Sequence, residues 1–310
     1  MLLLARAFTL IDWKNIQKAL PTIEIWWLLL TLVLLWLSNV LSGVRWGKIM
    51  QSSGFPHPTI EYVRWYFSGG LINQGLPTTL GGDSYRAISA YNAFSTSIPL
   101  NEQINRSKQL PNLKSSFFNV ALDRSLGFAG NSILGAIGLG IGGAVMSDWL
   151  SSAGWILTWI MILGAGVIAL IISIKPSKMI IERIFQRLQI QQGIKSIESA
   201  WGWPNVIFQI PLAIMIHIFT LMAFWACIRA CHLDAPIEAL LIGIPAVSIL
   251  MILPISISGW GLRETSLVGI LGLWHLDPSL IILSSLLYGL ITLITLLPGL
   301  LRLVVKKKST

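Results

Sequence analysis

Charged residues are scarce in this sequence. Asp, Glu, Lys and Arg make up only 11% of its 310 residues, whereas hydrophobic residues make up 54% and the mean hydropathy is +0.73. No long polar stretch is left from which a separate soluble domain could be built. The composition therefore predicts an all-α, polytopic integral membrane protein that forms one transmembrane domain over residues 1–310.

Cysteine and the usual marks of catalysis are nearly absent as well. Cys227 and Cys231 are the only cysteines, and we interpret them as small buried hydrophobic residues rather than as a metal or redox pair. The four histidines have no metal-ligand spacing, and the sequence contains no nucleotide-binding P-loop. No His, Asp and Ser side chains converge on one motif. We therefore expect no metal, no cofactor, no catalytic residues and no enzymatic activity.

Basic residues outnumber acidic ones and give a net charge of +9. They fall between apolar runs, where anionic lipid headgroups and the positive-inside bias account for them, and no basic face with interleaved aromatic residues occurs. The sequence thus predicts membrane lipids as partners and no nucleic acid.

Apolar runs divide the chain into candidate membrane spans. The convincing spans cover residues 25–44, 117–146, 154–174, 206–228 and 280–301. Two further runs, 60–76 and 237–253, each lead into a stretch that no continuous helix can cross. The second span, from Gly127 to Gly143, is rich in glycine, which suits either internal helix packing or a homo-oligomer interface.

The two broken stretches follow the same plan. LPTTLGGDSYRAISAYN (76–92) and LPISISGWGLRETSLVGI (253–270) each open with Leu-Pro and place an arginine nine positions after the proline. Pro77 and Pro254, each followed by glycines, mark the helix breaks. At membrane depth such a break survives only if it is buried in protein or lines a polar cavity, so both stretches are candidate sites.

Arginine is the chemistry-bearing residue in both stretches. Arg86 and Arg263 would lie at membrane depth, where an arginine is costly and needs a partner, and their forked guanidinium groups suit phosphate oxygens. Asp83 and Glu264 would orient them in the absence of lipid. The remaining candidate substrate-binding residues are Gly81, Gly82, Gly259, Gly261, Ser258, Asn73, Asp123 and Arg124.

Structural interpretations compete with these assignments. Each arginine could pair only with its neighbouring carboxylate, or with Asp123, and so lock the hairpins. Asp123 and Arg124 could form a local ion pair or snorkel. Asn73 could line the cavity or merely satisfy freed backbone groups.

The distribution of Lys and Arg predicts the topology. Residues 44–115 carry seven, 175–200 carry five and 302–308 carry four, whereas 146–153 and 273–278 carry none. The rich segments share the cytoplasmic side only if each broken stretch is a re-entrant hairpin. We therefore expect two inverted repeats, residues 22–146 with a cytoplasmic hairpin at 60–94, and residues 154–302 with an opposite hairpin at 237–274.

This topology also places the remaining segments. Residues 175–200 form a basic amphipathic segment on the cytoplasmic side, and the C-terminus is cytoplasmic, in the plasma (inner) membrane. The N-terminal segment falls outside despite Arg6, Lys14 and Lys18, as a short periplasmic amphipathic helix.

The motifs resemble those of a known family. LPTTLGGDSYRAISAY is similar to the LP-x-x-x-GGD-x-x-R-A segment, and ISGWGLRETS to the GG-x-G-x-RE segment, of the lysylphosphatidylglycerol synthase transmembrane, or flippase-like, family. RWGKIM and ALDRSLGF resemble its further marks. Two departures stand out: the family usually begins with one more helix, which suggests a truncated or late start here, and Ser258 stands where a glycine is commoner.

The resemblance implies lipid handling. Members of the family move aminoacylated phospholipids, polyprenyl-linked sugars or other polar lipids between leaflets, or stand beside such machinery. It favours a flippase or scramblase for an anionic phospholipid or polyprenyl phosphate. The alternatives are a non-transporting lipid-binding subunit with a partner lipid-modifying enzyme or glycosyltransferase, and an enzyme that modifies the headgroup. Because no soluble aminoacyl-transfer domain follows, lysyl transfer by this polypeptide is not expected.

Overall fold

The computed structural model describes residues 11–76, 80–99, 110–142, 185–190, 192–251 and 256–305, together with residues 9 and 183. Within these ranges every regular element is a helix and there is no strand. The all-α fold class is therefore confirmed. The expected span at 154–174, the first part of the basic segment (175–182), and both Pro77 and Pro254 lie outside the described residues.

The helices follow the apolar runs of the sequence. In chain order they are α2 (Trp13–Ala19), η1 (Leu20–Thr22), α3 (Ile25–Ser52), α4 (Thr59–Gln74), α5 (Leu80–Ser97), α7 (Leu113–Gly142), α11 (Gly193–Trp201), α12 (Val206–Ala230), α13 (Ile237–Leu250), α14 (Leu262–Leu271), η2 (Gly272–Trp274), α15 (Pro278–Leu296) and α16 (Pro298–Val305).

Local sequence explains several helix ends. Asp12 and Asp277 cap α2 and α15 with their carboxylates, which accept from the N–H groups of Lys14 and Leu280. α3 continues beyond its expected end to Ser52 and stops before Gly54, whose φ of +89° leaves the helical region. The last span, expected to run to residue 301, divides instead into α15 and α16 just before Pro298.

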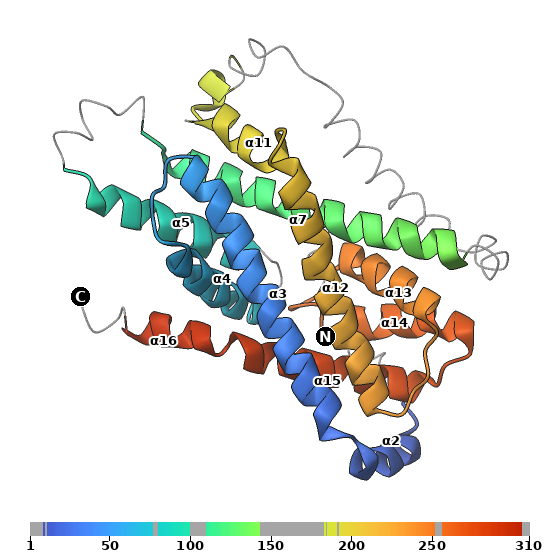
Figure 1. Ribbon diagram of the computed structural model, residues 1–310. Coiled ribbons are helices and arrows are strands. Elements are labelled where there is room, and N and C mark those ends of the chain that lie inside the picture. The colour runs from blue at the N-terminus through green and yellow to red at the C-terminus, as the bar shows by residue number, and fades with distance from the viewer. Residues whose placement is uncertain are drawn as a thin grey trace.

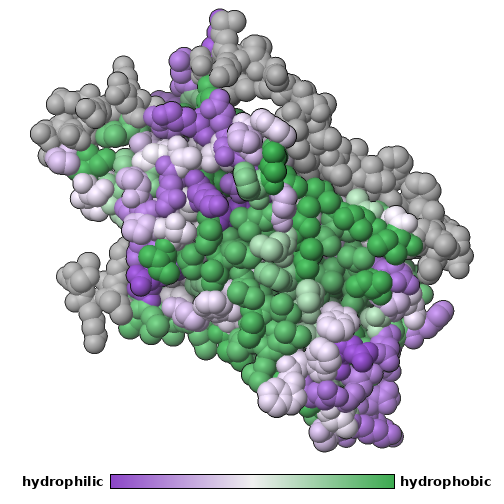
Figure 2. All heavy atoms as spheres, in the orientation of Figure 1, coloured by the Kyte–Doolittle hydropathy of each residue, from purple (hydrophilic) through white to green (hydrophobic). Residues whose placement is uncertain are grey.

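Three described helices, α3, α12 and α15, are long and apolar enough to cross a membrane. α3 and α12 pack against each other through the middle of the molecule, with α4 and α5 on one side and α13 and α14 on the other (Figure 1). Figure 2 shows a broad hydrophobic surface over this middle, with hydrophilic residues gathered beyond it at opposite ends. The chain is a multi-pass membrane protein.

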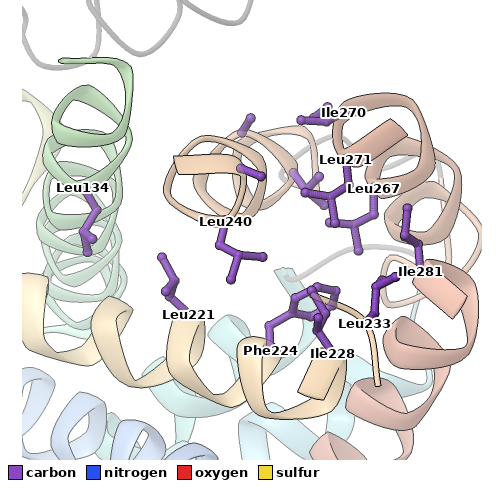
Figure 3. Packing of buried hydrophobic residues seen from close by; sticks show 13 residues of the cluster. Leu134, Leu221, Phe224, Ile228, Leu233, Leu240, Leu267, Ile270, Leu271 and Ile281 are labelled. Atoms are coloured by element: carbon purple, nitrogen blue, oxygen red, sulfur yellow. The ribbon is translucent and has the colours of Figure 1, made fainter. Parts of the chain in front are cut away.

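Each side of the molecule has its own core. α12, α13, α14 and α15 surround a buried hydrophobic cluster that includes Phe224, Leu240 and Leu267, and Leu134 of α7 joins it (Figure 3). On the other side, aromatic residues of α3, α4 and α5 form a second cluster around Trp46, Tyr62 and Trp65. These two cores hold the helices that flank the two breaks.

Candidate functional site

The two helix breaks meet inside the molecule. α4 ends at Gln74 and α5 begins at Leu80, whereas α13 ends at Leu250 and α14 begins at Leu262. The Ser258 hydroxyl donates to Gln74 Oε1 at 2.7 Å, and the Ser258 N–H donates to the Leu76 carbonyl at 3.3 Å. Stretches that are 184 residues apart in the sequence are thereby joined at their tips.

The second break depends on backbone with positive φ. Gly259 and Gly261 have φ values of +80° and +84°, which glycine adopts without the clash that a Cβ would cause. Ser258 has a φ of +51°, an unfavourable conformation for a non-glycine residue. Its hydrogen bond to Gln74 offsets part of that cost.

Small residues bring α4 and α5 together at the first break. A Cβ added at Gly82 would lie 2.0 Å from the Gly69 carbonyl oxygen, and one at Gly81 would lie 2.0 Å from Cδ1 of Leu76. Asn73 Oδ1 accepts a hydrogen bond from the Gly82 N–H at 2.6 Å. Asn73 therefore satisfies one of the free N–H groups in the first turn of α5, which is the structural role weighed for it above.

Arg86 lies deep between three helices and is only 3% exposed. Its Nη2 pairs with Asp83 Oδ1 at 2.7 Å, and its Nη1 pairs with Asp123 Oδ2 at 3.3 Å. The rings of Trp46 and Tyr66 lie 5.0 and 4.7 Å from the guanidinium carbon, which gives it cation–π contacts. The arginine is thus held by carboxylates and by aromatic faces.

Asp123 and Arg124 belong to the same network, and each pairs with residues other than its neighbour. Asp123 Oδ1 accepts from Nε of Arg45 at 2.9 Å, whereas Arg124 forms a two-pronged contact with Asp83 at 2.8 and 2.9 Å. We call Arg45, Asp123, Arg86, Asp83 and Arg124 the first charge cluster. Its charges alternate along the chain of contacts, which begins and ends with an arginine.

Arg263 forms the corresponding centre beside the second break. Its Nη2 lies 2.8 Å from Oε1 of Glu264, its Nε donates to Ser285 Oγ at 2.8 Å, and Glu264 also accepts from the Gly261 N–H at 2.6 Å. Arg263 is 7% exposed and Glu264 is fully buried. Trp260 and Tyr288 contribute their ring faces at 5.1 and 5.7 Å. Arg263 and Glu264 are the second charge cluster.

Sequence reasoning missed some of these partners. Arg45 and Ser285 were not among the candidate residues, although Arg45 opens the RWGKIM motif, which was a usable signal. The aromatic residues around each arginine carried no signal that separates them from interfacial aromatics. Within the described ranges, no three His, Cys, Asp or Glu side chains gather where they could hold a metal ion.

Comparison with known proteins places the chain in a family. No curated protein matches it, and no solved structure matches it. Residues 1–299 match the family described as the lysylphosphatidylglycerol synthase TM region, which confirms the resemblance seen in the motifs. With nearly the whole chain covered and both arginine motifs in place, the protein belongs to the lysylphosphatidylglycerol synthase transmembrane family.

Proposed function

We propose that this protein is a lipid translocator, a flippase or scramblase that moves an anionic phospholipid or a polyprenyl phosphate between the leaflets of the plasma membrane. One observation carries the proposal. A buried arginine–carboxylate cluster lies beside each of two helix breaks, and the breaks touch through Gln74 and Ser258. Membership of a membrane family concerned with lipids agrees with it.

The arrangement of the helices supports re-entrant hairpins. The ring of Phe55, just before α4, stacks 5.2 Å from that of Phe94 near the end of α5, so the first hairpin begins and ends at one place. In the second hairpin, Gly243 in the middle of α13 lies against Leu271 at the end of α14, so its two helices pack on each other. In our proposal these are the re-entrant elements of two inverted repeats, one entering from each face, with the C-terminus cytoplasmic.

The chemistry of the two clusters suits a phosphate that passes between them. An arginine fork binds phosphate oxygens through two N–H groups, and in the absence of lipid the carboxylates of Asp83 and Glu264 occupy those donors. When lipid binds, its phosphate replaces part of these contacts while the tail stays in the bilayer. The protein forms and breaks no covalent bond in this scheme, so it is not an enzyme.

The test is transport by purified protein in proteoliposomes. Labelled phosphatidylglycerol and polyprenyl phosphate are followed as they become protected from a membrane-impermeant quencher. Arg86→Gln and Arg263→Gln are expected to slow transport at least tenfold, whereas Arg64→Gln, which changes a 58% exposed arginine of α4, should transport as the parent does.

Three outcomes are informative. Transport that stalls in both variants while size-exclusion profiles stay normal supports the translocator. Folded variants that still move lipid would show that the arginines only lock the hairpins. If folded parent protein moves none of the lipids, the proposal fails, and a lipid-binding subunit that needs a partner enzyme takes its place.

A further inference from the structure

The two charge clusters do not carry the same charge. The second cluster pairs one arginine with one glutamate and is neutral. The first cluster sets three guanidinium groups against two carboxylates and is left with one positive charge. Arginine cannot shed its proton at any ordinary pH, so this surplus persists.

Arg45 is where the surplus is least compensated. The residue is 4% exposed, and Nε and Nη2 bind Asp123, but Nη1 is a buried donor without a hydrogen-bond partner. Gly127 lies beside this guanidinium group: a Cβ added there would lie 3.4 Å from Nη2 and 3.9 Å from Nη1 of Arg45, and 3.9 Å from Nε2 of His217. Asp123 cannot neutralise Arg45 alone, because its other oxygen is shared with Arg86.

The cluster is open to a ligand at its other end. Arg124 is 48% exposed, whereas Asp83, which connects it to Arg86, is 13% exposed. An anion that contacts Arg124 is therefore only one carboxylate away from the buried arginines. Charges in such a weakly screened interior act together, so the total charge of the cluster governs which headgroup completes it.

We propose that the first charge cluster selects lipids whose headgroup is a phosphodiester with a net charge of −1, and that Arg45 is the residue that sets this preference. The inference rests on the proposed function and narrows its substrate. A monoanionic headgroup makes the cluster with its bound lipid neutral, and a zwitterionic headgroup leaves its charge at +1. A phosphomonoester dianion changes the total charge to −1. Phosphatidylglycerol-like lipids thus fit the cluster better than polyprenyl phosphate.

A binding experiment tests this independently of transport. Purified protein in neutral detergent is loaded with fluorescent phosphatidylglycerol, which is then displaced by dioleoyl lipids of different headgroup charge. These are phosphatidylglycerol, phosphatidylcholine and, at pH 8, phosphatidate, whose monoester is mainly a dianion at that pH. The parent should bind phosphatidylglycerol at least tenfold more tightly than either of the others.

Charge variants then shift the preference in opposite directions. Arg45→Gln makes the cluster neutral and should abolish the preference for phosphatidylglycerol over phosphatidylcholine, whereas Arg45→Lys keeps the charge and should retain it. Asp83→Asn adds one positive charge and should move the optimum toward phosphatidate. Arg64→Gln removes a cation outside both clusters and should bind as the parent does.

The outcomes separate this inference from the proposed function. A folded parent protein without charge preference overturns the inference even if it moves lipid. A parent that prefers phosphatidylglycerol but moves no lipid supports the inference and overturns the translocator. If Arg45→Gln does not fold, the headgroup preferences of Arg45→Lys and Asp83→Asn test the inference instead. If Asp83→Asn binds the three lipids with the same preference as the parent, the charge argument is refuted.

Discussion

Gly82 determines how closely the two helices of the first hairpin pack. A methyl group there would lie 2.0 Å from the Gly69 carbonyl oxygen and 2.6 Å from Asn73 Oδ1, and the first of these atoms belongs to the backbone. Gly82→Ala should therefore lower the free energy of unfolding by about 1–3 kcal/mol, because α4 and α5 must separate. Thermal unfolding in detergent measures this loss.

The matched control for this substitution is in the other hairpin. Gly269 of α14 has nothing within 4 Å of an added Cβ, so Gly269→Ala should leave stability unchanged or raise it by up to ~1 kcal/mol, as alanine favours helix. Equal melting of Gly82→Ala and the parent would mean that the two helices are packed less closely than described.

Arg263 and Glu264 should behave as one unit. Removing either charge leaves the other buried without its partner, which costs about 3–5 kcal/mol in comparable buried pairs. The double variant Arg263→Gln/Glu264→Gln should be less destabilised than the sum of the two single variants, and a double-mutant cycle on thermal unfolding checks this. Additive losses would show that the two side chains do not interact.

The sequence predicts the second charge cluster better than the first. Arg86 with Asp83, and Arg263 with Glu264, are near neighbours in their motifs, so spacing alone brings them together. Arg45 reaches Asp123 across 78 residues, and that contact depends on how α3 and α7 face each other, which no local pattern encodes.

Among the helices, the contact between the two breaks is one of those that join the halves of the molecule. Ser258→Ala and Gln74→Ala should each lose one hydrogen bond, about 0.5–1.5 kcal/mol, and the double variant should lose little more than either single one. Ser258→Gly loses the same bond but also relieves the left-handed strain at φ +51°, so it should melt above Ser258→Ala. Equal melting temperatures of Ser258→Gly and Ser258→Ala would show that the left-handed backbone at residue 258 costs no stability.

The loop between α3 and α4 is expected to respond to pH. His57 stacks edge-on against Trp65 at 5.5 Å, and burial lowers its pKa below the usual 6.5; Glu61 raises this pKa and Arg302 lowers it, so burial wins. A lowered pKa in the folded state means that folding favours the neutral ring. The stabilisation is present above about pH 6.5 and is lost as the pH falls through the folded-state pKa.

Melting temperatures between pH 8 and pH 5 test this response. The parent should lose stability on acidification more steeply than His57→Gln, which has no titrating ring at this position. Parallel curves for the two proteins would show that His57 contributes nothing to the pH dependence.

Helices were easier to predict than the way they meet. The apolar runs predicted α3, α12 and α13 from their first residues, because hydropathy and turn signals are local. The division of the last span into α15 and α16 differs from the prediction, although Pro298 at the start of α16 is a local signal for a helix break. A Cβ at Gly299 would lie 2.6 Å from the Phe67 backbone, so α16 packs directly on α4.

At the scale of the whole molecule, the two ends of the apolar body can be told apart. Ser53 and Ser196 contact each other at 2.8 Å, which places the end of α3 and helix α11 together at one end. α12 leads from there to Ala230, whose carbonyl accepts from the Glu24 N–H, so α2 lies at the opposite end. The positive-inside bias predicts that the end with α11 and the end of α3, which carries residues of the basic segments 44–115 and 175–200, is the cytoplasmic one.

Cysteine labelling in intact cells tests that orientation. Lys48 and Lys195 are exposed at the end of the molecule shared by α3 and α11, and Lys18 is exposed in α2 at the other end. Lys48→Cys and Lys195→Cys should be protected from an impermeant maleimide until the membrane is permeabilised, whereas Lys18→Cys should react at once. Cys227 and Cys231 are buried, so the parent provides a low background. The reversed labelling pattern would mean that the proposed topology is inverted, with the second hairpin entering from the cytoplasm. Labelling of all three sites in intact cells would contradict a membrane-spanning arrangement.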